Sequence, residues 1–535
     1  MSLMRSIATV GGFTMLSRVT GFARDILIAG TLGAGTVADA FFVAFKFPNL
    51  FRRLFAEGAF AAAFVPLFAA TLEKEGRAEA KLFAERAFTL LALVVAGLTA
   101  VMMIIMPWAM YAFAPGFTEV PGKRELAVEL ARITFPYLLF ISLCSLLSGV
   151  LNALGKFAAA AATPILLNLS LIGALLGLTA FTETPGHALA WGTAIAGVLQ
   201  FAWLMVAARK LGMLPRFVRP TLSPRIRVLL TRIVPVAFGA GLYQINLLVD
   251  TILASLVSDG AVSYLYYADR VNQLPLGVIG VAVGTALLPL LARQIAAGNE
   301  VAAAQSQNRA IEFALLLTLP AMAGLMVLAG PIITVLFERG AFSAADATAT
   351  AGALAAFSVG LPAYVLVKVL APGFFAREDT RTPVRIAAVA LVANVVLNLI
   401  LMQVLGHVGI ALATALSACL NAGLLLWLLI KRGHFVWDRR LRRRLPRMVL
   451  ATGLMAGAVW GMVQAAKVWL PVFGHAPIGA LVLVACIGVA LVVYFGAALG
   501  LGAVQRNDLT FLARRRGPPP SAPPQSGPPP SGNAG

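Results

Sequence analysis

The chain has 535 residues, of which 60% are hydrophobic and only 12% are charged, and its mean hydropathy is +0.88. Because soluble domains carry about one-quarter charged residues, this composition excludes a soluble globular protein and predicts an all-α polytopic membrane protein. The formal net charge is +20. In a chain this apolar, we interpret the excess as a signal of topology and of attraction to anionic membrane lipids, and we expect no nucleic-acid partner.

Apolar runs of about 20 residues, the length that crosses a bilayer, predict about 14 transmembrane helices. They begin near residues 8, 37, 87, 126, 158, 188, 233, 262, 311, 347, 386, 408, 448 and 477. Both termini and the loops on their side hold most of the Lys and Arg, whereas the opposite loops hold only Lys123, Arg124 and Arg339. The positive-inside rule therefore predicts cytoplasmic termini. We expect no cleaved signal peptide, because Arg18 and Arg24 interrupt the first apolar run.

The first two predicted spans carry charged residues, which are costly in a bilayer. A charge at the membrane centre costs at least ~2.5 kcal/mol, so such residues usually face a protein-lined or water-filled cavity. In the first span, Arg18 and Asp25 lie seven residues apart on one helix face, with Arg24 beside Asp25. The second span carries a stripe of charges at helical spacing together with a further arginine: Asp39, Lys46, Arg53 and Glu57, with Arg52. These charges predict a polar cavity lined by both helices.

An internal repeat relates the two halves of the chain. A shift of 223 residues aligns 39–69 with 262–292. A slightly different register sets Phe135-Pro136-Tyr137 against Leu361-Pro362-Ala363. Each half holds six predicted spans, an even number, so the two halves run in the same direction through the membrane and predict two parallel lobes around a central cavity.

The second half adds two cationic groups to the predicted cavity. Asp269 and Arg270 follow an aromatic run in the eighth span, and Lys368 lies alone in the tenth. Cations that outnumber carboxylates in one cavity predict an anionic cargo, because guanidinium groups bind phosphate oxygens bidentately. The predicted substrate-binding residues are Arg18, Arg24, Arg52, Arg53, Arg270 and Lys368. The predicted supporting or gating charges are Asp25, Asp39, Lys46, Glu57 and Asp269.

Three glycines of the eighth span, Gly277, Gly280 and Gly284, recur at intervals of three and four residues. This spacing places them on one face of a helix. Small residues in membrane helices usually allow two backbones to approach closely. We therefore expect this face to pack against another helix.

Four polar residues in the seventh, eleventh and twelfth spans suit a sodium ion: Asp250, Asn394, Asn398 and Thr414. Asn394 and Asn398 lie four residues apart on one helix face, and such residues also form interhelical hydrogen bonds. We expect no other cofactor. Because the chain lacks the GxxxxGK[ST] phosphate loop, transport energy is expected to come from sodium or from the membrane potential.

Two further predicted spans follow the repeat and lie outside it. A basic linker precedes them, and a segment rich in Pro, Gly and Ser follows, which is typical of a disordered tail. The predicted organisation is an N-terminal lobe, a C-terminal lobe, a linker with two helices, and a cytoplasmic tail, at 1–220, 221–433, 434–505 and 506–535.

Two long motifs carry a resemblance to a known family. They are MLSRVTGFARD from Met15 to Asp25 and ADAFFVAFKFPNLFRRLFAEGAF from Ala38 to Phe60, supported by APGF at 114–117 and YADR at 267–270. Over about residues 1–505 the chain resembles the MurJ (MviN) lipid II flippases. These belong to the multidrug/oligosaccharidyl-lipid/polysaccharide exporter superfamily, abbreviated MOP.

The resemblance implies a monomeric flippase of the bacterial inner membrane that works by alternating access. Its cargo would be lipid II, an undecaprenyl-pyrophosphate-linked disaccharide-pentapeptide, moved from the cytoplasmic to the periplasmic leaflet for peptidoglycan synthesis. By the same resemblance, the last two helices form a groove for the lipid tail, and some relatives carry a carboxylate where Asn398 stands, which weakens the sodium prediction. The arginines associated with function in that family match Arg18, Arg24, Arg52 and Arg270.

Three other functions share parts of this pattern. A flippase for another polyprenyl-pyrophosphate-linked glycan needs the same arginines, whereas a multidrug or cation antiporter of the superfamily needs acidic cavity residues. An enzyme acting on lipid-linked sugars needs a carboxylate pair or a metal motif in a large extramembrane loop. No predicted loop is long enough for such a site. The sequence therefore predicts a transporter rather than an enzyme.

Overall fold

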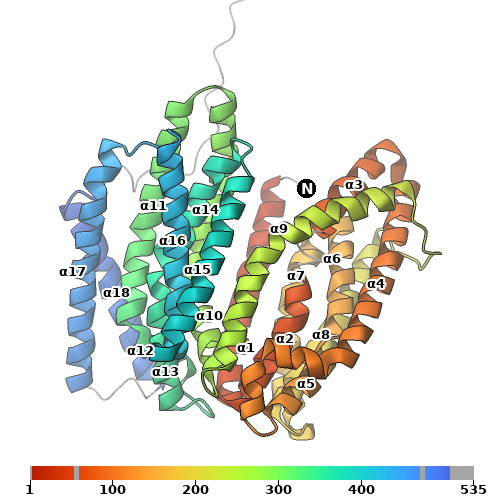
Figure 1. The fold of residues 1–535 in the computed structure, drawn as a ribbon, viewed down its shortest axis with the longest axis horizontal. Helices are drawn as coiled ribbons and strands as arrows, with labels where there is room; N and C mark the ends of the chain where they lie inside the picture. Colours follow the sequence, from red (N-terminus) through yellow and green to blue (C-terminus); the bar gives the residue numbers. More distant parts are fainter. Residues whose placement is uncertain (1–2, 53–59, 470–475, 506–535) are drawn as a thin grey trace, which may run out of the picture.

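The computed structural model describes residues 3–52, 60–469 and 476–505, and within these ranges it contains helices and turns but no β-strand. The helices form two bundles that meet at one end and diverge at the other, like the arms of a V (Figure 1). Ten helical segments of the described residues are long and apolar enough to cross a membrane. The prediction of an all-α polytopic membrane protein is confirmed.

The first bundle, which we call the N-lobe, contains the helices of the first half of the chain. Within it α1 packs against α7, α7 and α6 pack against α8, and α2 packs against α5. Short 3-10 turns, η2 (Pro115–Glu119) and η3 (Thr179–Phe181), connect some of these helices. The helices are α1 (Leu3–Leu32), α2 (Thr36–Phe51), α3 (Ala61–Lys74), α4 (Gly76–Phe113), α5 (Lys123–Thr134), α6 (Tyr137–Ala153), α7 (Phe157–Gly177) and α8 (Pro185–Lys210).

The second bundle, the C-lobe, begins with a helix that crosses from one bundle to the other. α9 contacts α3 and α4 of the N-lobe as well as α15 and α16 of the C-lobe, and Figure 1 shows it bending between the two. The helices are α9 (Pro224–Ser255), α10 (Ala261–Ala296), α11 (Glu300–Val327), α12 (Ala329–Phe337), α13 (Ala344–Val359), α14 (Leu361–Phe375), α15 (Arg381–Leu405) and α16 (His407–Lys431).

The helix bounds of the two lobes follow the predicted repeat. Moved by 223 residues, α1 would cover 226–255 and α8 would cover 408–433, and α9 and α16 match these ranges to within two residues at each end. The interruptions repeat as well. α5 gives way to α6 at Pro136, and α13 gives way to α14 beside Pro362. Proline lacks the backbone donor that would continue the helix, which explains a break at both positions.

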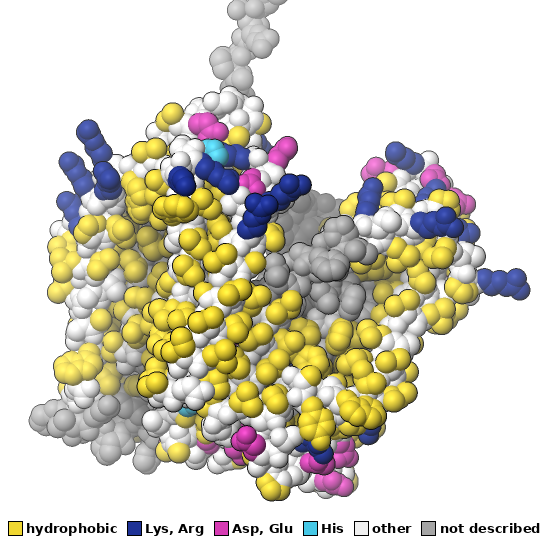
Figure 2. Space-filling view, in the orientation of Figure 1, with side chains coloured by type: hydrophobic (Ala, Val, Ile, Leu, Met, Phe, Trp, Pro, Cys, Tyr) yellow, Lys and Arg dark blue, Asp and Glu magenta, His cyan; other side chains and the backbone are white. Residues whose placement is uncertain are grey.

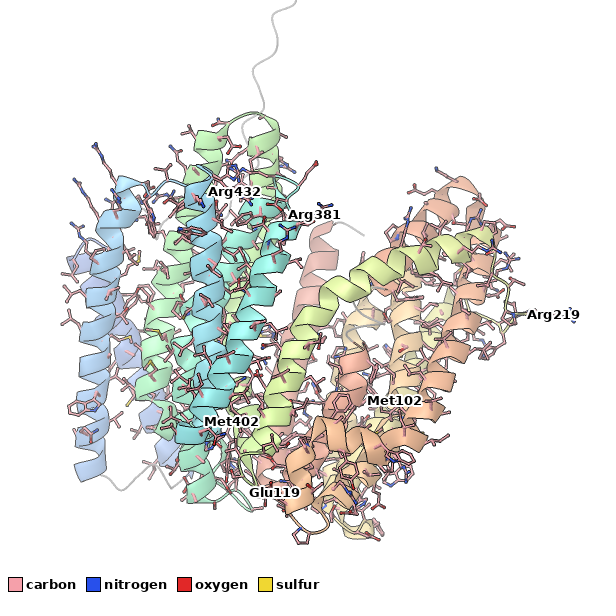
Figure 3. The ribbon with its side chains drawn as sticks, viewed as in Figure 1. Met102, Glu119, Arg219, Arg381, Met402 and Arg432 are labelled. Carbon is pink, nitrogen blue, oxygen red and sulfur yellow. The ribbon has the colours of Figure 1, made fainter. Side chains whose placement is uncertain are left out.

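The two ends of the molecule differ in charge. Lys and Arg side chains gather at the end where the lobes diverge (Figure 2). Arg381 and Arg432 mark this end in Figure 3, and Glu119 and Met402 mark the opposite end, where the lobes meet. Several helices extend beyond the predicted apolar spans at the basic end: α4 begins at Gly76 rather than near residue 87. Charged turns outside the bilayer continue the helix there.

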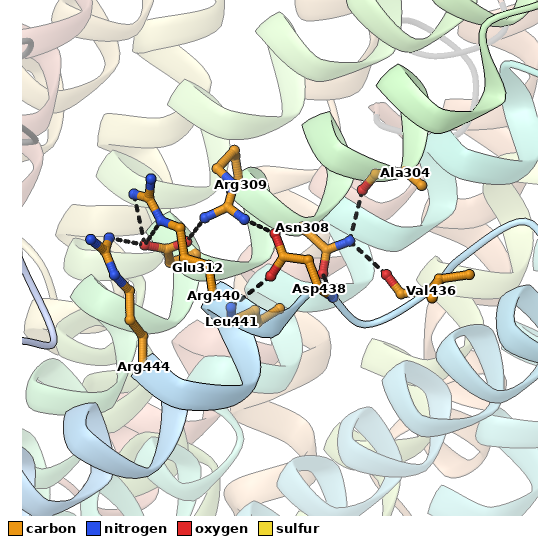
Figure 4. Close-up of polar contacts among 9 residues, drawn as sticks. All are labelled: Ala304, Asn308, Arg309, Glu312, Val436, Asp438, Arg440, Leu441 and Arg444. Carbon is orange, nitrogen blue, oxygen red and sulfur yellow. Dashed lines mark hydrogen bonds and ion pairs between the residues drawn. The ribbon is translucent and has the colours of Figure 1, made fainter.

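Two further helices, α17 (Arg439–Trp469) and α18 (Ala476–Gly500), pack against each other and against α11. A group of charges that we call the Glu312 cluster attaches α17 to α11 (Figure 4): Arg309, Glu312, Asp438, Arg440 and Arg444. Glu312 is buried and accepts hydrogen bonds from Arg444 and from Arg440, the latter at 3.1 Å from Nη2. Asp438 pairs with Arg309 and accepts the Leu441 N–H at 2.6 Å, which caps the start of α17.

Candidate functional site

A buried carboxylate joins the two lobes where they meet. Asp39 of α2 is fully buried; its Oδ1 accepts the backbone N–H of Ser263 at 2.8 Å and the Ser263 hydroxyl at 2.6 Å. Its Oδ2 accepts the N–H of Gly260 and the Lys123 ammonium, each at 2.8 Å. Lys123 also contacts Asp259 at 2.5 Å. We call these five residues the seam cluster.

The seam cluster follows from an ordinary property of helix ends. The first N–H groups of a helix have no partner within it and attract a negative charge. In this molecule α10 belongs to the C-lobe, and the carboxylate at its N-terminus comes from Asp39 of the N-lobe. The carboxylate therefore satisfies this helix end only while the two lobes are in contact.

Glycines close the rest of this seam by bringing backbones together. The Ala341 N–H donates to the Gly30 carbonyl at 2.8 Å, and the Tyr267 hydroxyl donates to the Gly33 carbonyl at 3.2 Å. A Cβ added at Gly340 or Gly116 would collide with a backbone carbonyl of the other lobe. The lobes thus meet at a tightly packed seam at the end opposite the basic one.

Above the seam, two arginines from different lobes share one carboxylate. Arg24 donates to Asp25 Oδ1 through Nε at 3.0 Å and Nη2 at 2.6 Å, and its Nη1 donates to Asn168 Oδ1 at 2.8 Å. Arg270 of α10 lies 3.6 Å from Asp25 Oδ2 through its Nε. We call this group the Asp25 cluster: Arg24, Asp25, Asn168, Tyr266 and Arg270.

An aromatic side chain holds the second arginine in place. The Arg270 guanidinium lies 4.7 Å from the centre of the Tyr266 ring, and that ring stacks on Phe42 of α2 with centroids 3.8 Å apart. The Tyr266 hydroxyl also donates to Asp25 at 3.3 Å. Two guanidinium groups facing one carboxylate leave the Asp25 cluster with an excess of positive charge, and part of Arg270 is exposed. This arrangement suits an anion.

The remaining predicted charges lie around these clusters. Lys46 donates to the Thr251 hydroxyl of α9 at 2.8 Å, Arg52 donates through Nε to Asn49 at 3.1 Å, and Asp269 accepts a hydrogen bond from Gln273. Arg18 and Lys368 are exposed side chains and make no hydrogen bond or ion pair with any residue that the structure describes. The predicted residues Arg53 and Glu57, like the tail at 506–535, lie outside the described residues.

The four residues predicted to bind sodium come together inside the C-lobe. Asp250 accepts the Asn398 amide at 2.8 Å and the Thr414 hydroxyl at 3.2 Å, and the Asn398 amide also donates to Asn394 at 2.6 Å. Asp250 is therefore hydrogen-bonded, although it forms no ion pair with any residue of the described ranges. The Asn398 Oδ1 atom is buried without a hydrogen-bond partner. The amide nitrogen of Asn398 faces Asp250 and Asn394, so the amide oxygen is the atom left unsatisfied. A carboxylate, amide oxygens and a hydroxyl are the oxygen ligands that a hard cation prefers.

The described residues contain no group of three or more His, Cys, Asp or Glu side chains that would suit a transition metal. Sequence reasoning missed several residues that complete the two clusters: Lys123, Asp259, Ser263, Asn168 and Tyr266. For Lys123 a signal existed, since it is one of few basic residues on its side of the predicted membrane. Asn168 and Ser263 are common polar residues in membrane helices, and nothing in their sequence context marks them.

Comparison with known proteins gives matches over nearly the whole chain. A family model described as lipid II flippase MurJ matches residues 28–478. The chain is 44% identical over 534 residues to a probable lipid II flippase MurJ of Rhizobium tropici, which covers 98% of each chain. It is 39% identical over 463 residues to the lipid II flippase MurJ of Burkholderia cenocepacia, which covers 85% of this chain and 89% of the relative.

Comparison with solved structures also finds a lipid II flippase MurJ. A structure of lipid II flippase MurJ in an inward closed conformation superposes with a TM-score of 0.78 at 26% identity, covering 94% of this chain and 99% of that one. An inward-facing multidrug resistance MATE family transporter of the MOP superfamily superposes with a TM-score of 0.63 at 17% identity, covering 79% and 97%. The second similarity concerns the fold alone.

Proposed function

The chain belongs to the lipid II flippase MurJ family, and we propose that its two lobes carry the diphosphate of lipid II past the Asp25 cluster while the lipid tail stays in the bilayer. The protein is a transporter of the MOP fold and not an enzyme. Peptidoglycan precursor transport follows from the family. The observation that carries the proposal is the Asp25 cluster, in which arginines of both lobes converge on a single carboxylate.

The charge balance of the cavity supports an anionic cargo. Arg24 and Arg270 share Asp25, and Arg18 and Lys368 add positive charge without a described partner. A diphosphate offers several oxygens that accept charge-assisted hydrogen bonds from such donors. A cation antiporter would need the opposite balance. These groups, with Arg52 and Arg53, form the proposed substrate site, in which Lys46 and Asp269 support the arginines.

The seam cluster supplies the proposed gate for alternating access. In this state the seam is closed and the lobes diverge at the basic end, so a headgroup enters from that end (Figure 2). To open at the seam, the lobes must separate there, which requires Asp39 to leave the N-terminus of α10 and to become hydrated. Neutralisation of the cavity by a bound diphosphate would allow the basic end to close before the seam opens.

Cells depleted of their own flippase test the proposed site. Arg24→Ala and Arg270→Ala should abolish growth rescue and reduce lipid II flipping at least tenfold, because each removes a donor to the diphosphate. Arg381→Ala serves as a control that removes a positive charge at the basic end, at the start of α15, away from the Asp25 cluster. Normal flipping by both cavity variants at normal expression would contradict the proposal.

We also propose that the protein is a monomer of the bacterial inner membrane with both termini in the cytoplasm. The gathering of Lys and Arg at the open end supports this orientation through the positive-inside rule. Both lobes that enclose the cavity come from one chain, which supports a monomer, and α17 and α18 are proposed to guide the lipid tail. A cysteine at Arg381 should react with membrane-impermeant reagents only from the cytoplasmic side, and one at Glu119 only from the periplasmic side.

For the driving force we propose sodium bound by Asp250, Asn394, Asn398 and Thr414. The buried, unpartnered Asn398 Oδ1 supports this assignment, because a cation would satisfy it. Sodium-dependent flipping in proteoliposomes that Asp250→Asn abolishes is the expected result. Flipping that needs only the membrane potential and ignores sodium would assign the driving force to the potential instead.

A further inference from the structure

One face of α10 carries Gly277 and Gly280, which the sequence predicted to pack against another helix. α10 does pack against α14, the helix that carries Lys368, and the structure shows which groups come closest to the two glycines. The side-chain surroundings of Gly284 lie outside the described residues. The atoms nearest to a Cβ built at Gly277 belong to the guanidinium of Arg18, and those nearest to a Cβ built at Gly280 belong to the end of the Lys368 side chain. The two glycines therefore face two of the cationic groups predicted to bind substrate, and no backbone atom of another helix is among the nearest atoms.

A larger residue at either position would force the neighbouring cationic group to move. A Cβ at Gly277 would lie 2.7 Å from Arg18 Nη2 and 2.9 Å from Arg18 Cζ. A Cβ at Gly280 would lie 3.1 Å from both Cδ and Nζ of Lys368. The first distances are shorter than real Cβ contacts, and the second is tighter than most of them. The Arg18 guanidinium thus occupies space that exists only because residue 277 has no side chain, and the end of Lys368 would have to shift by a few tenths of an ångström to accommodate one at residue 280.

The two cations lie near each other although they come from different lobes. Arg18 belongs to α1 of the N-lobe and Lys368 to α14 of the C-lobe. Residues three apart on a helix have Cβ positions about 5–6 Å apart, so the two cationic groups lie within about 12 Å of each other. Neither has a hydrogen-bond or ion-pair partner among the residues that the structure describes. Two positive charges with no counter-charge paired to them in the described part of the chain are thereby held beside one turn of α10.

We propose that Gly277 and Gly280 are positioning residues, which hold Arg18 and Lys368 as a two-cation cradle for the diphosphate of the cargo. The inference rests on the proposed function and adds to it the residues that place these donors. Because one donor comes from each lobe, a diphosphate bound in the cradle links the lobes directly. Without it, the like charges oppose the approach of α1 to α14.

A positioning role of Gly277 and a purely structural role predict different effects of Gly277→Ala on thermal stability. A methyl group at residue 277 forces the Arg18 guanidinium to move, but that group is the free end of a flexible side chain. The displacement therefore costs little folding energy, while it removes a donor from its binding position. Gly→Ala within a helix otherwise favours the helix slightly. Weaker cargo binding with unchanged thermal stability is the expected signature.

The experiment measures lipid II binding to the full chain in nanodiscs, with inorganic pyrophosphate as the competitor, together with Tm. Gly277→Ala and Gly280→Ala should raise the Kd for lipid II at least fivefold and weaken competition by pyrophosphate, with Tm unchanged. Gly324→Ala in α11 is the matched control, because a Cβ there meets nothing within 4 Å. In an Arg18→Ala background, Gly277→Ala should have no further effect, since the displaced group is already gone.

The outcomes separate the cradle from the proposed function. If Arg18→Ala and Lys368→Ala weaken binding but both glycine variants bind like the parent chain, the cradle is wrong and the cationic site stands. If Gly277→Ala weakens binding equally with and without Arg18, the glycine acts through packing and the cradle is also wrong. If the Arg18 and Lys368 variants bind normally, the proposed site itself fails and the cradle with it.

Discussion

Two buried carboxylates of this molecule gather basic side chains, and they differ in what they connect. Glu312 pairs with arginines of α11 and α17, which stay together within one side of the molecule (Figure 4). Asp39 binds Lys123 of its own lobe and the N-terminus of α10 across the seam. The same chemistry therefore serves as a permanent attachment in one region and as a contact between lobes in the other.

The difference lies in what happens to each charge when its contacts break. Opening the seam would return Asp39 to water, which replaces the lost hydrogen bonds and limits the cost. Glu312 would not become hydrated when the lobes move, because α17 covers it as long as α11 and α17 stay together. A buried charge is compatible with motion only where the motion itself hydrates it.

The largest expected effect comes from Lys123→Met, which leaves the fully buried Asp39 without its ammonium partner. Removing one partner of a buried pair costs about 3–5 kcal/mol, so the closed seam should weaken by about 3 kcal/mol. Labelling of a cysteine at the buried residue 261 should then become more than tenfold faster. Lys156→Met, at an exposed loop, is the control. Unchanged labelling would show that Asp39 and the helix end hold the seam without Lys123.

A smaller effect is expected from Glu312→Gln, which keeps the shape of the side chain and removes its charge. Hydrogen bonds to charged groups contribute about 1.5–3 kcal/mol, so the attachment of α17 should lose about 2 kcal/mol. Tm should fall, while flipping by the folded molecules at low temperature should match the parent chain. Glu183→Gln at an exposed turn is the control. A loss of flipping without a loss of Tm would place the Glu312 cluster in the transport cycle.

Asp259→Asn tests the exposed edge of the seam cluster. The Asp259 side chain is 43% exposed, so water screens its attraction to Lys123. The ion pair should therefore stabilise the closed seam by about 1 kcal/mol or less. The same cysteine at residue 261 should label only a few times faster than in the parent chain. An effect as large as that of Lys123→Met would mean that Asp259, and not Asp39, carries the closure.

The smallest effect is expected at the exposed start of α9, where this helix lies against the N-lobe. Arg225 pairs with Glu75 and Glu79, and all three side chains are more than one-third exposed. Such pairs contribute about 0–1 kcal/mol. Arg225→Ala should therefore leave both seam labelling and flipping unchanged and shift Tm by about 1 °C or less. A larger shift in seam labelling would show that the start of α9 helps to hold the lobes together.

The sequence predicted the helices and the repeat more completely than the contacts between them. Hydrophobic runs are local, so the spans and the matching interruptions at Pro136 and Pro362 can be read directly from residue order. The convergence of Asp250 with Asn394, Asn398 and Thr414 was also predicted, because buried polar residues in an apolar helix require partners. The group that approaches Gly277 was not predicted, because a small residue signals a close approach without saying what approaches.

The amino-acid sequence by itself determined that this protein is a helical membrane transporter with charges inside its spans, because hydropathy and the cost of a buried charge are properties of single helices. Only the tertiary structure decided which charges pair. Arg24 reaches Asn168, 144 residues away, and Asp39 reaches Lys123, 84 residues away, while Arg18 is left beside a glycine of the other lobe. Partners over such separations depend on how helices pack, and that packing is settled by the whole bundle at once.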